Sequence, residues 1–455
     1  MGRAPAARQM ALGLFVRAHG HHLAAWRQPG VPAEAGLTLA HYQRVVGAAE
    51  RAKLDFVFLA DSMGVRASIQ PTAAYARTPH LTHFEPITLL SALAATTRHI
   101  GLVATASTTY YQPYQVARQF ASLDFLSNGR AAWNVVTSNG VGEAENFSGE
   151  AHPQREARYG RAVEFVDVVK RLWDSWEDDA FLWDRDSGVV MDTDKVHAPR
   201  HQGAHFCVAG PLNVSRPPQG HPVIVQAGGS PAGMDLAART ADVVFAVHPA
   251  LADAQRFYAD LKARAAAVGR DPDSLRIMPG IFPVVGRSRA EAQEKYAQLQ
   301  QRLDPVLAVA QLSNLLDGVD LSGLALDQPL PDIPATNASL MRLKALRETG
   351  ARDGLTLLQL AQRIAGSRGH YQVFGTAADI ADQMEDWFLH SAADGFNLLP
   401  ATLPGGFDDF AALVLPELRR RGLFRHDYGG TTLRAHLGLE RPAHPASLPR
   451  KTTKP

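Results

Sequence analysis

Residues able to bind or activate a ligand are concentrated where apolar segments of this sequence end. Hydroxyl, amide, carboxylate and imidazole groups at such points could together surround one ligand that has many hydrogen-bonding edges. Five apolar segments end in this way. The residues at these ends are, in chain order, Arg17, His19, His21 and His22; Asp61 and Ser62; Thr105, Ser107, Thr108, Thr109, Tyr110 and Tyr111; Asn134, Thr137 and Ser138; and Gln226, Gly228, Gly229 and Ser230.

The last of these groups has two interpretations. Gly228-Gly229-Ser230-Pro231 places free backbone N–H groups at the start of a predicted helix, where a phosphate binds well. Ser230 could also serve only as the N-cap of that helix, and Asp61 could likewise be only a cap for the helix that follows it.

Several other chemistries lack the residues they need. The sequence contains no G-x-S-x-G nucleophile elbow, no Walker-type phosphate loop and no G-x-G-x-x-G between a strand and a helix. The single cysteine, Cys207, excludes an intramolecular disulfide and a cysteine-rich metal site. The three early histidines have no acidic or histidine partner at metal-ligand spacing, so we predict no metal site.

Eight apolar runs that alternate with amphipathic helices would position these residues. Most are nearly continuous, as parallel strands buried on both faces are. The runs span 11–18, 55–61, 100–107, 131–138, 223–229, 243–248, 277–286 and 396–402, and the helices include 40–53, 86–97, 113–126, 156–176, 231–240, 251–268 and 376–390. Eight strands alternating with helices favour a closed (β/α)8 TIM barrel over an open doubly wound sheet, with the active site at the carboxyl ends of the strands.

A barrel of this kind needs about 250 residues, so this chain of 455 residues has a surplus. We expect insertions near 62–85, 139–155, 178–222 and 304–375. None of them shows an evident core of its own. Residues 1–440 are therefore predicted to form one decorated barrel, with separate domains as the alternative, and 441–455 are expected to be a flexible C-terminal tail.

The overall charge is close to balanced, at +1 from 46 basic and 45 acidic residues. This balance gives no reason to expect a nucleic acid or an anionic membrane as a partner. No run approaches the roughly 18 apolar residues of a membrane-spanning helix. With its single cysteine the chain is typical of a reducing cytoplasm, and we expect a cytoplasmic protein.

Ordered blocks of the sequence resemble one known family almost from end to end. They include GHHLAAWRQP (20–29), AERAKLDFVFLADS (49–62), PVIVQAGGSPAG (222–233) and LVLPELRRRGLFRHDYGGTTLRAHLGL (413–439). These blocks are similar to the bacterial-luciferase-like flavin-dependent monooxygenases. Within them they most resemble the group of nitrilotriacetate monooxygenase component A, dibenzothiophene sulfone monooxygenase and long-chain alkane monooxygenase. The family fold is a (β/α)8 barrel with insertions, in agreement with the strand count.

The resemblance also implies a reaction. The family uses reduced FMN (FMNH2), supplied by a separate NAD(P)H:flavin oxidoreductase, together with O2, and forms a C4a-peroxyflavin that oxygenates an organic substrate. It therefore implies a two-component monooxygenase acting on an aminopolycarboxylate, a sulfone or other organosulfur compound, or an alkane-like molecule. Family habit further implies a homodimer or homotetramer.

A set of FMN contacts is implied residue by residue. Ser230 and Tyr159 would hold the phosphate, and Asp61 would lie near the ring system. Arg155 stands where the family commonly has a second histidine, four residues before the tyrosine, although arginine can bind a phosphate through two donors. The whole implied cofactor-binding set is Asp61, Thr105, Ser107, Asn134, Ser138, Arg155, Tyr159, Gly229 and Ser230.

Three residues are implied to act in the reaction itself. His21, His22 and Asn134 would lie near the reactive edge of the flavin, and simple packing of a histidine beneath Trp26 is the alternative for the first two.

Substrate choice is expected to lie in the insertions, because loops at a barrel mouth vary. The cationic residues of 64–84 would favour an anionic substrate if they are not merely solvated surface; they are Arg66, Arg77, His80 and His83. The 304–375 insertion would be a mobile lid.

Rival interpretations of the function are a deazaflavin (F420)-dependent oxidoreductase of the same fold, a phosphate-dependent barrel lyase or isomerase, and a flavin-binding protein without catalysis.

Overall fold

The computed structural model describes residues 8–65, 72–138, 141–147, 152–316, 318–321, 323–333 and 337–448. Within them a parallel sheet closes into a barrel, because β8 (Val243–Ala246), at one end of the barrel order, also pairs with β9 (Arg276–Val285), at the other end. In barrel order the strands are β9, β11 (Gly395–Leu398), β1 (Ala11–Phe15), β2 (Phe56–Leu59), β3 (Gly101–Ser107), β4 (Ala131–Val136), β7 (Val223–Gln226) and β8. The predicted (β/α)8 barrel is confirmed.

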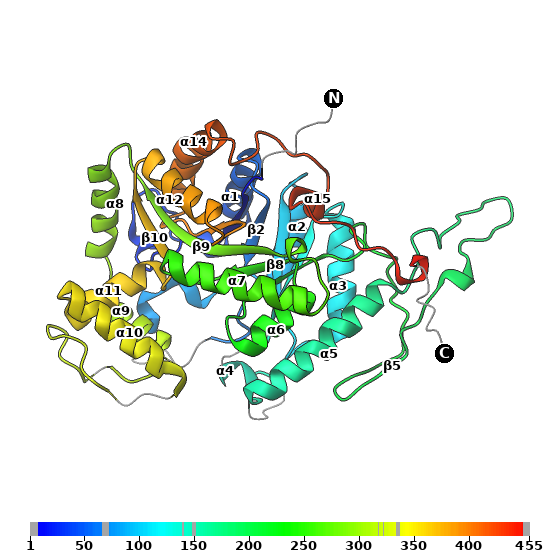
Figure 1. Ribbon diagram of the computed structural model, residues 1–455, viewed down its shortest axis with the longest axis horizontal. Helices are drawn as coiled ribbons and strands as arrows, with labels where there is room; N and C mark the ends of the chain where they lie inside the picture. The colour runs from blue at the N-terminus through cyan, green and yellow to red at the C-terminus, as the bar shows by residue number, and fades with distance from the viewer. Residues whose placement is uncertain are drawn as a thin grey trace.

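The predicted helices are also confirmed, within a few residues at their ends. They are α1 (Leu39–Arg51), α2 (Pro86–Ala94), α3 (Pro113–Leu126), α5 (Arg155–Trp173), α6 (Pro231–Thr240), α7 (Leu251–Ala267) and α12 (Ala377–Leu389). Figure 1 shows them arranged around the strands. Several begin at a side chain that accepts from the first free N–H groups. At α12, Thr376 and Asp379 form a reciprocal capping box.

The strands alternate between two apolar layers, as a barrel with a filled interior requires. Val103, Ala132 and Val225 belong to a cluster inside the barrel. Their chain neighbours, among them Leu102 and Trp133, belong to the larger cluster between the strands and the helices.

Elements that the sequence did not reveal also occur. Helix α8 (Arg289–Gln301) follows β9, and strand β10 (Tyr371–Gly375) pairs with the carboxyl half of β9 outside the closed ring. Shorter pieces include α4 (Val141–Ala144), α13 (Gly405–Asp409), a π-helical turn (Phe410–Val414), α14 (Leu415–Arg420) and α15 (Leu433–His436).

The 304–375 insertion forms helices α9 (Pro305–Leu315), α10 (Asn337–Asp353) and α11 (Leu357–Ser367), at the lower left of Figure 1. Our expectation that no insertion has an evident core was wrong here. Its leucines and alanines form a separate apolar cluster, which also takes in Leu23, Ala24 and Ala74. That core was hidden in the sequence because part of it comes from distant segments. The prediction of a single domain over 1–440 stays a prediction.

The 62–85 insertion packs on this cluster through the 3-10 helix η3 (Thr72–Arg77), which contacts α9. Arg77 Nε donates to Asp304 Oδ2 at 2.7 Å, where α9 begins. The two predicted insertions are therefore one structural unit beside the carboxyl ends of β1 and β2.

The 178–222 insertion extends to the other side of the molecule, at the right of Figure 1, and contains the two-stranded pair β5 (His201–Gln202) and β6 (Cys207–Val208). Residues 441–448 lie against its base. Arg441 donates to Asp178 Oδ2 at 2.9 Å and to Pro218 O at 2.9 Å. This part of the expected flexible tail is thus held by specific contacts, and 449–455 lie outside the described residues.

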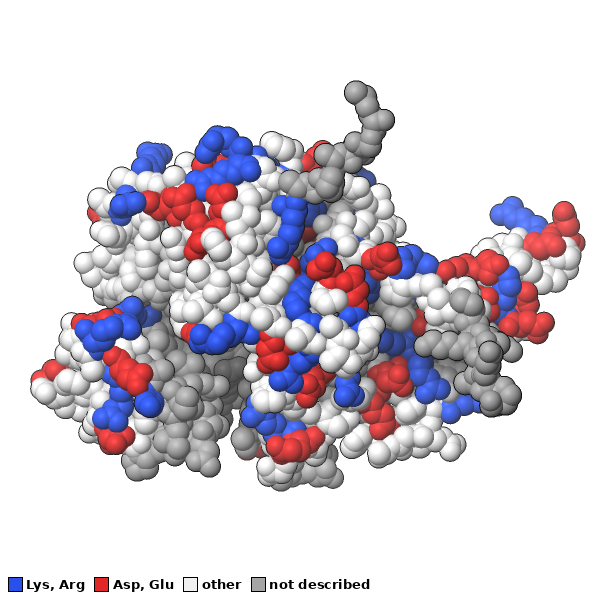
Figure 2. Space-filling view, viewed as in Figure 1, with Lys and Arg blue, Asp and Glu red and all other residues white. Residues whose placement is uncertain are grey.

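Charges of both signs are interleaved on the face drawn in Figure 2, in keeping with the balanced composition. Among the helices of the described residues, none has the length and hydropathy that crossing a lipid bilayer requires.

Candidate active site at the carboxyl ends of the strands

The centre of the barrel mouth is a hydrogen-bonded pair, Thr105 and Asn134. Strand register places these two residues opposite each other on β3 and β4, on the face that looks into the barrel. The Thr105 hydroxyl donates to Leu59 O at 2.8 Å, so its oxygen accepts from Asn134 Nδ2 at 2.9 Å. This arrangement fixes the amide orientation. Asn134 Oδ1 is buried and has no hydrogen-bond partner among the described residues, so it can accept from a ligand N–H.

The next polar pair at the mouth is Ser107 and Ser138, whose hydroxyl oxygens lie 2.9 Å apart. Ser138 has a left-handed backbone with φ of 44°, and its carbonyl accepts from Arg158 Nη1 at 2.7 Å. Helix α5 therefore holds the end of β4 in place. Both hydroxyls can reorient toward a ligand, because each is donor and acceptor.

The predicted phosphate site lies where β7 leads into α6. Ser230 is the N-cap of α6, its Oγ accepting from Gly233 N at 3.2 Å, and its hydroxyl donates to the Tyr159 hydroxyl oxygen at 3.3 Å. A Cβ at Gly229 would meet nothing within 4 Å, so open space lies above this backbone. Two hydroxyls, a helix N-terminus and open space form a site suited to a phosphate.

Arginines flank this site from α5. Arg155 is the first residue of α5 and is exposed, one turn before Tyr159. Arg158 contacts the imidazole of His152, whose Nδ1 lies 2.7 Å from the Tyr110 hydroxyl. Burial and the adjacent Arg158 lower the pKa of His152. The guanidinium groups of Arg155 and Arg158 thus supply positive charge near the proposed phosphate position.

Asp61 lies beyond the end of β2. Its Oδ1 is 2.8 Å from His83 Nε2, within hydrogen-bond distance. Both residues line a cavity of about 190 Å³. Because β2, β3, β4 and β7 are consecutive in the barrel and strands lie about 4.8 Å apart, Asp61 and Ser230 are at opposite ends of an arc roughly 14 Å long. The predicted cofactor residues are therefore distributed as an elongated ligand requires.

His21 and His22 are buried but neither is among the residues that line this cavity. His21 Nε2 lies 2.9 Å from Phe15 O, and its ring packs edge-on against the Phe15 ring. His22 Nδ1 accepts from Ala24 N at 3.1 Å, and its ring faces Tyr296 at 5.9 Å. Burial lowers the pKa of His22 to about 4 and that of His21 well below its usual value, so both are neutral at pH 7.

Three residues in or next to the cavity were not identified from the sequence as site residues. Arg17 follows β1, and Arg368 ends α11; both line the cavity. His370 is buried beside them and has room only because position 280 is glycine, where a Cβ would lie 2.3 Å from the His370 Nδ1 atom. Arg17 stood at a strand end and could have been selected, but nothing local in the sequence links Arg368 to the mouth.

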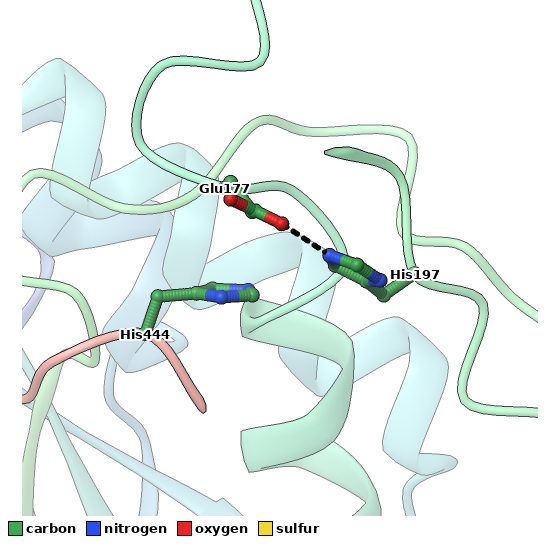
Figure 3. Close-up of side chains that lie close together, drawn as sticks. All are labelled: Glu177, His197 and His444. Carbon is green, nitrogen blue, oxygen red and sulfur yellow. Dashed lines mark hydrogen bonds and ion pairs between the residues drawn. The ribbon is translucent and has the colours of Figure 1, made fainter. Parts of the chain in front are cut away.

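A group of metal-ligand types lies elsewhere, at Glu177, His197 and His444 (Figure 3). His197 Nε2 lies 2.8 Å from Glu177 Oε1. In His444, Nδ1 accepts from Ala446 N at 3.1 Å and Nε2 lies 3.0 Å from Asp174 O. Because both nitrogens of His444 are used by the backbone, this ring has no lone pair for a metal. The contact with Asp174 instead attaches His444 to the end of α5.

Comparison with known proteins places the chain in one family. A model of the luciferase-like monooxygenases matches residues 18–392. Over 439 residues, the chain is 49% identical to the N-acetyl-S-(2-succino)cysteine monooxygenase of Bacillus subtilis, covering 96% of this chain and 98% of that one. It is 46% identical over 449 residues to nitrilotriacetate monooxygenase component A of Aminobacter aminovorans, covering 97% and 99%.

A solved structure of riboflavin lyase, determined with modified FMN and riboflavin, superimposes with a TM-score of 0.84 at 34% identity, covering 96% of this chain and 97% of that one. The fold and these relatives define a flavin-dependent barrel enzyme. The chain belongs to the luciferase-like monooxygenase family.

The residues at the mouth fit a flavin nucleotide. Besides Asn134 Oδ1, the amide oxygen Oε1 of Gln226 at the end of β7 is buried without a hydrogen-bond partner among the described residues. Such buried acceptors cost stability unless a ligand or water satisfies them. Together with the hydroxyl pair at Ser230 and the open backbone at Gly229, they match the edges and phosphate of FMN.

Proposed function

We propose that this protein is the oxygenase component of a two-component system that uses reduced FMN and O2 to oxygenate a small organic substrate. The observation that carries the proposal is the arc of polar groups from Asp61 through Thr105 and Asn134 to Ser230. Bound there, reduced FMN would supply the electrons and the site of reaction with O2.

Each residue of the arc has a defined task in this proposal. Asn134 Oδ1 accepts from an N–H of the ring, in an orientation that Thr105 enforces. Tyr159 donates to the phosphate, Ser230 does so when its hydroxyl turns from the Tyr159 oxygen to the ligand, and Gly229 lets the backbone approach it. Arg155 replaces the family histidine as a source of positive charge near the phosphate rather than as a fixed contact, since it is exposed. Ser107 and Ser138 supply reorienting hydroxyls between the two ends.

His21 and His22 enter the proposal as positioning residues. Each is neutral, buried and engaged with the backbone, so each fixes the segment after β1 that forms one wall of the cavity. A water-tight wall would matter here because an oxygen-activating site loses efficiency when water enters.

The partner would be an NAD(P)H:flavin oxidoreductase. The word "component" in the name of the Aminobacter relative supports a division of labour between two proteins. A supply of reduced flavin from NAD(P)H in turn supports a cytoplasmic location, and we infer a homodimer or homotetramer from family habit.

Rapid mixing tests this proposal. Protein loaded anaerobically with reduced FMN is mixed with O2 while the flavin absorbance is followed. We expect a transient spectrum distinct from both reduced and oxidised FMN, which free FMN does not show.

In Tyr159→Phe the dissociation constant for FMN should rise severalfold, since one phosphate donor is lost. Tyr114→Phe is the matched control, because its hydroxyl lies 3.4 Å from Pro211 O in the 178–222 insertion.

The rival functions give different results in the same experiment. Immediate formation of oxidised FMN without a transient would remove the oxygenase proposal and leave a flavin-binding protein. Preferential binding of F420, with hydride transfer and no response to O2, would favour the deazaflavin-dependent alternative.

A further inference from the structure

We propose that the cavity at the carboxyl ends of β1 and β2 binds a substrate bearing carboxylates, with Arg17 and Arg368 as the carboxylate-binding residues. The proposal deepens the proposed function by choosing one class among aminopolycarboxylates, organosulfur compounds and alkanes. The reaction of the bound acid rests on that function, whereas its binding can be tested without it.

The cavity lies between the barrel and the paired insertions. The barrel supplies the segments after β1 and β2, the 62–85 insertion supplies residues 78–84, and α9 covers the space from the opposite side. Asp61, a predicted contact of the flavin ring, lies in its wall. A ligand in this cavity would therefore lie next to the predicted position of the flavin.

Two guanidinium groups from distant parts of the chain contribute to the same wall. Arg17 and Arg368 both line the cavity, and both lower the pKa of His80 and of His370, in addition to the larger effect of burial. Two positive charges that act on the same rings lie in one electrostatic environment. Among the described residues of the cavity wall, Asp61 is the only carboxylate, and it is engaged with His83.

His80 adds a polar group that points to a ligand. It lines the cavity and is half-buried, and its buried Nε2 has no hydrogen-bond partner among the described residues. Since its pKa lies well below the usual value, the ring is neutral at pH 7 and offers one donor or acceptor without adding charge.

The chemistry of this wall distinguishes the substrate classes. Guanidinium groups pair with carboxylates through two parallel, charge-assisted hydrogen bonds. An alkane or a neutral sulfone would displace water from the same guanidinium groups without forming an ion pair that compensates for the lost hydration. Apolar residues also line the cavity, including Leu23, Leu59 and Leu307, and they suit the carbon skeleton of an organic acid.

The anionic preference expected from the 64–84 loop is thus supported through different residues. Arg77 is turned away to Asp304, and Arg66 lies outside the described residues. His80 and His83 do line the cavity, but the guanidinium groups come from the end of β1 and from α11.

Equilibrium binding tests the proposal. Titration calorimetry with succinate, citrate and nitrilotriacetate, each beside its methyl ester, is performed on the FMN-free protein and on the protein with oxidised FMN. We expect at least one acid to bind at least tenfold more tightly than its ester, and the affinity to fall as salt is raised. Arg368→Gln and Arg17→Gln should each weaken that acid at least tenfold, and Arg368→Lys should weaken it less.

Arg363→Gln is the matched control, since Arg363 also lies on α11 but is paired with Asp353 at the surface. It should leave acid binding unchanged. FMN affinity of every variant is measured separately by flavin fluorescence, so loss of acid binding with retained FMN binding isolates this site from the proposed function. Equal binding of acids and esters, or undiminished acid affinity in both glutamine variants, would overturn the proposal even if FMN binds.

Discussion

At the residue scale, the orientation of Asn134 follows from its position in the alternation of β4. Trp133 and Val135 point to the helices, so Asn134 must point into the barrel, where Thr105 of the neighbouring strand fixes it. A buried amide costs stability unless its hydrogen bonds are satisfied. The unsatisfied Oδ1 is therefore able to accept a hydrogen bond from a ligand.

Ser230 is the N-cap of α6 and, in the proposed function, also a phosphate contact, and substitution can separate the two roles. Ser230→Ala removes the N-cap of α6 and should cost about 1 kcal/mol of unfolding free energy, together with a severalfold loss of FMN affinity. Ser288→Ala removes the equivalent cap of α8, where Ser288 Oγ accepts from Glu291 N at 3.1 Å, and should cost about the same stability with no change in FMN affinity. Urea denaturation and flavin fluorescence measure both quantities. Equal FMN affinity in the two variants would refute the phosphate contact.

At the element scale, the junction between β7 and α6 depends on two adjacent glycines with different requirements. A Cβ at Gly228 would lie 2.6 Å from Gln226 Nε2 and 2.9 Å from Gly233 Cα. The first turn of α6 therefore packs directly on the loop backbone. A Cβ at Gly229 would instead point into open space. Packing therefore holds the loop backbone at Gly228, and the backbone at Gly229 is accessible to a ligand.

This difference gives opposite expectations for two alanine substitutions. Gly228→Ala should lower the unfolding free energy by about 1–3 kcal/mol, because backbone atoms must move. Gly229→Ala should leave stability within about 0.5 kcal/mol of the parent protein but weaken FMN binding, since the new methyl group occupies the space proposed for the phosphate. Thermal unfolding and FMN titration of both variants provide the measurement. Undiminished FMN binding in Gly229→Ala would place the phosphate elsewhere.

At the scale of the whole molecule, buried histidines make stability depend on pH. Burial lowers the pKa of His22 and His436 to about 4 and that of His370 to about 3. Below their unfolded pKa near 6.5, the unfolded chain binds more protons than the folded protein, so stability falls as pH falls from about 6.5 to about 4. Asp124 opposes this trend, since burial raises its pKa to about 6 and protonation then favours the folded state.

Substitution of one histidine far from the mouth tests this balance. His436 lies in α15, with its Nε2 2.9 Å from Gly430 O. In His436→Gln the decline of unfolding free energy between pH 6.5 and 4 should be shallower, by at most about 1.4 kcal/mol per pH unit, with no change above pH 7. Urea midpoints at several pH values measure the slope. An unchanged slope would show that His436 is not a source of the pH dependence.

The sequence alone determined the barrel, its eight strands and the polar residues at their carboxyl ends. These features depend on local alternation and on the rule that parallel strands place their carboxyl ends at one edge. It therefore placed Thr105, Asn134 and Ser230 at the mouth. Only tertiary structure decided that His21 and His22 are not among the residues that line the cavity, built a core from Leu23, Ala74 and the 304–375 insertion, and brought Arg368 to the cavity that Arg17 also lines. These outcomes depend on contacts between segments distant in sequence, which packing decides and which no local pattern encodes.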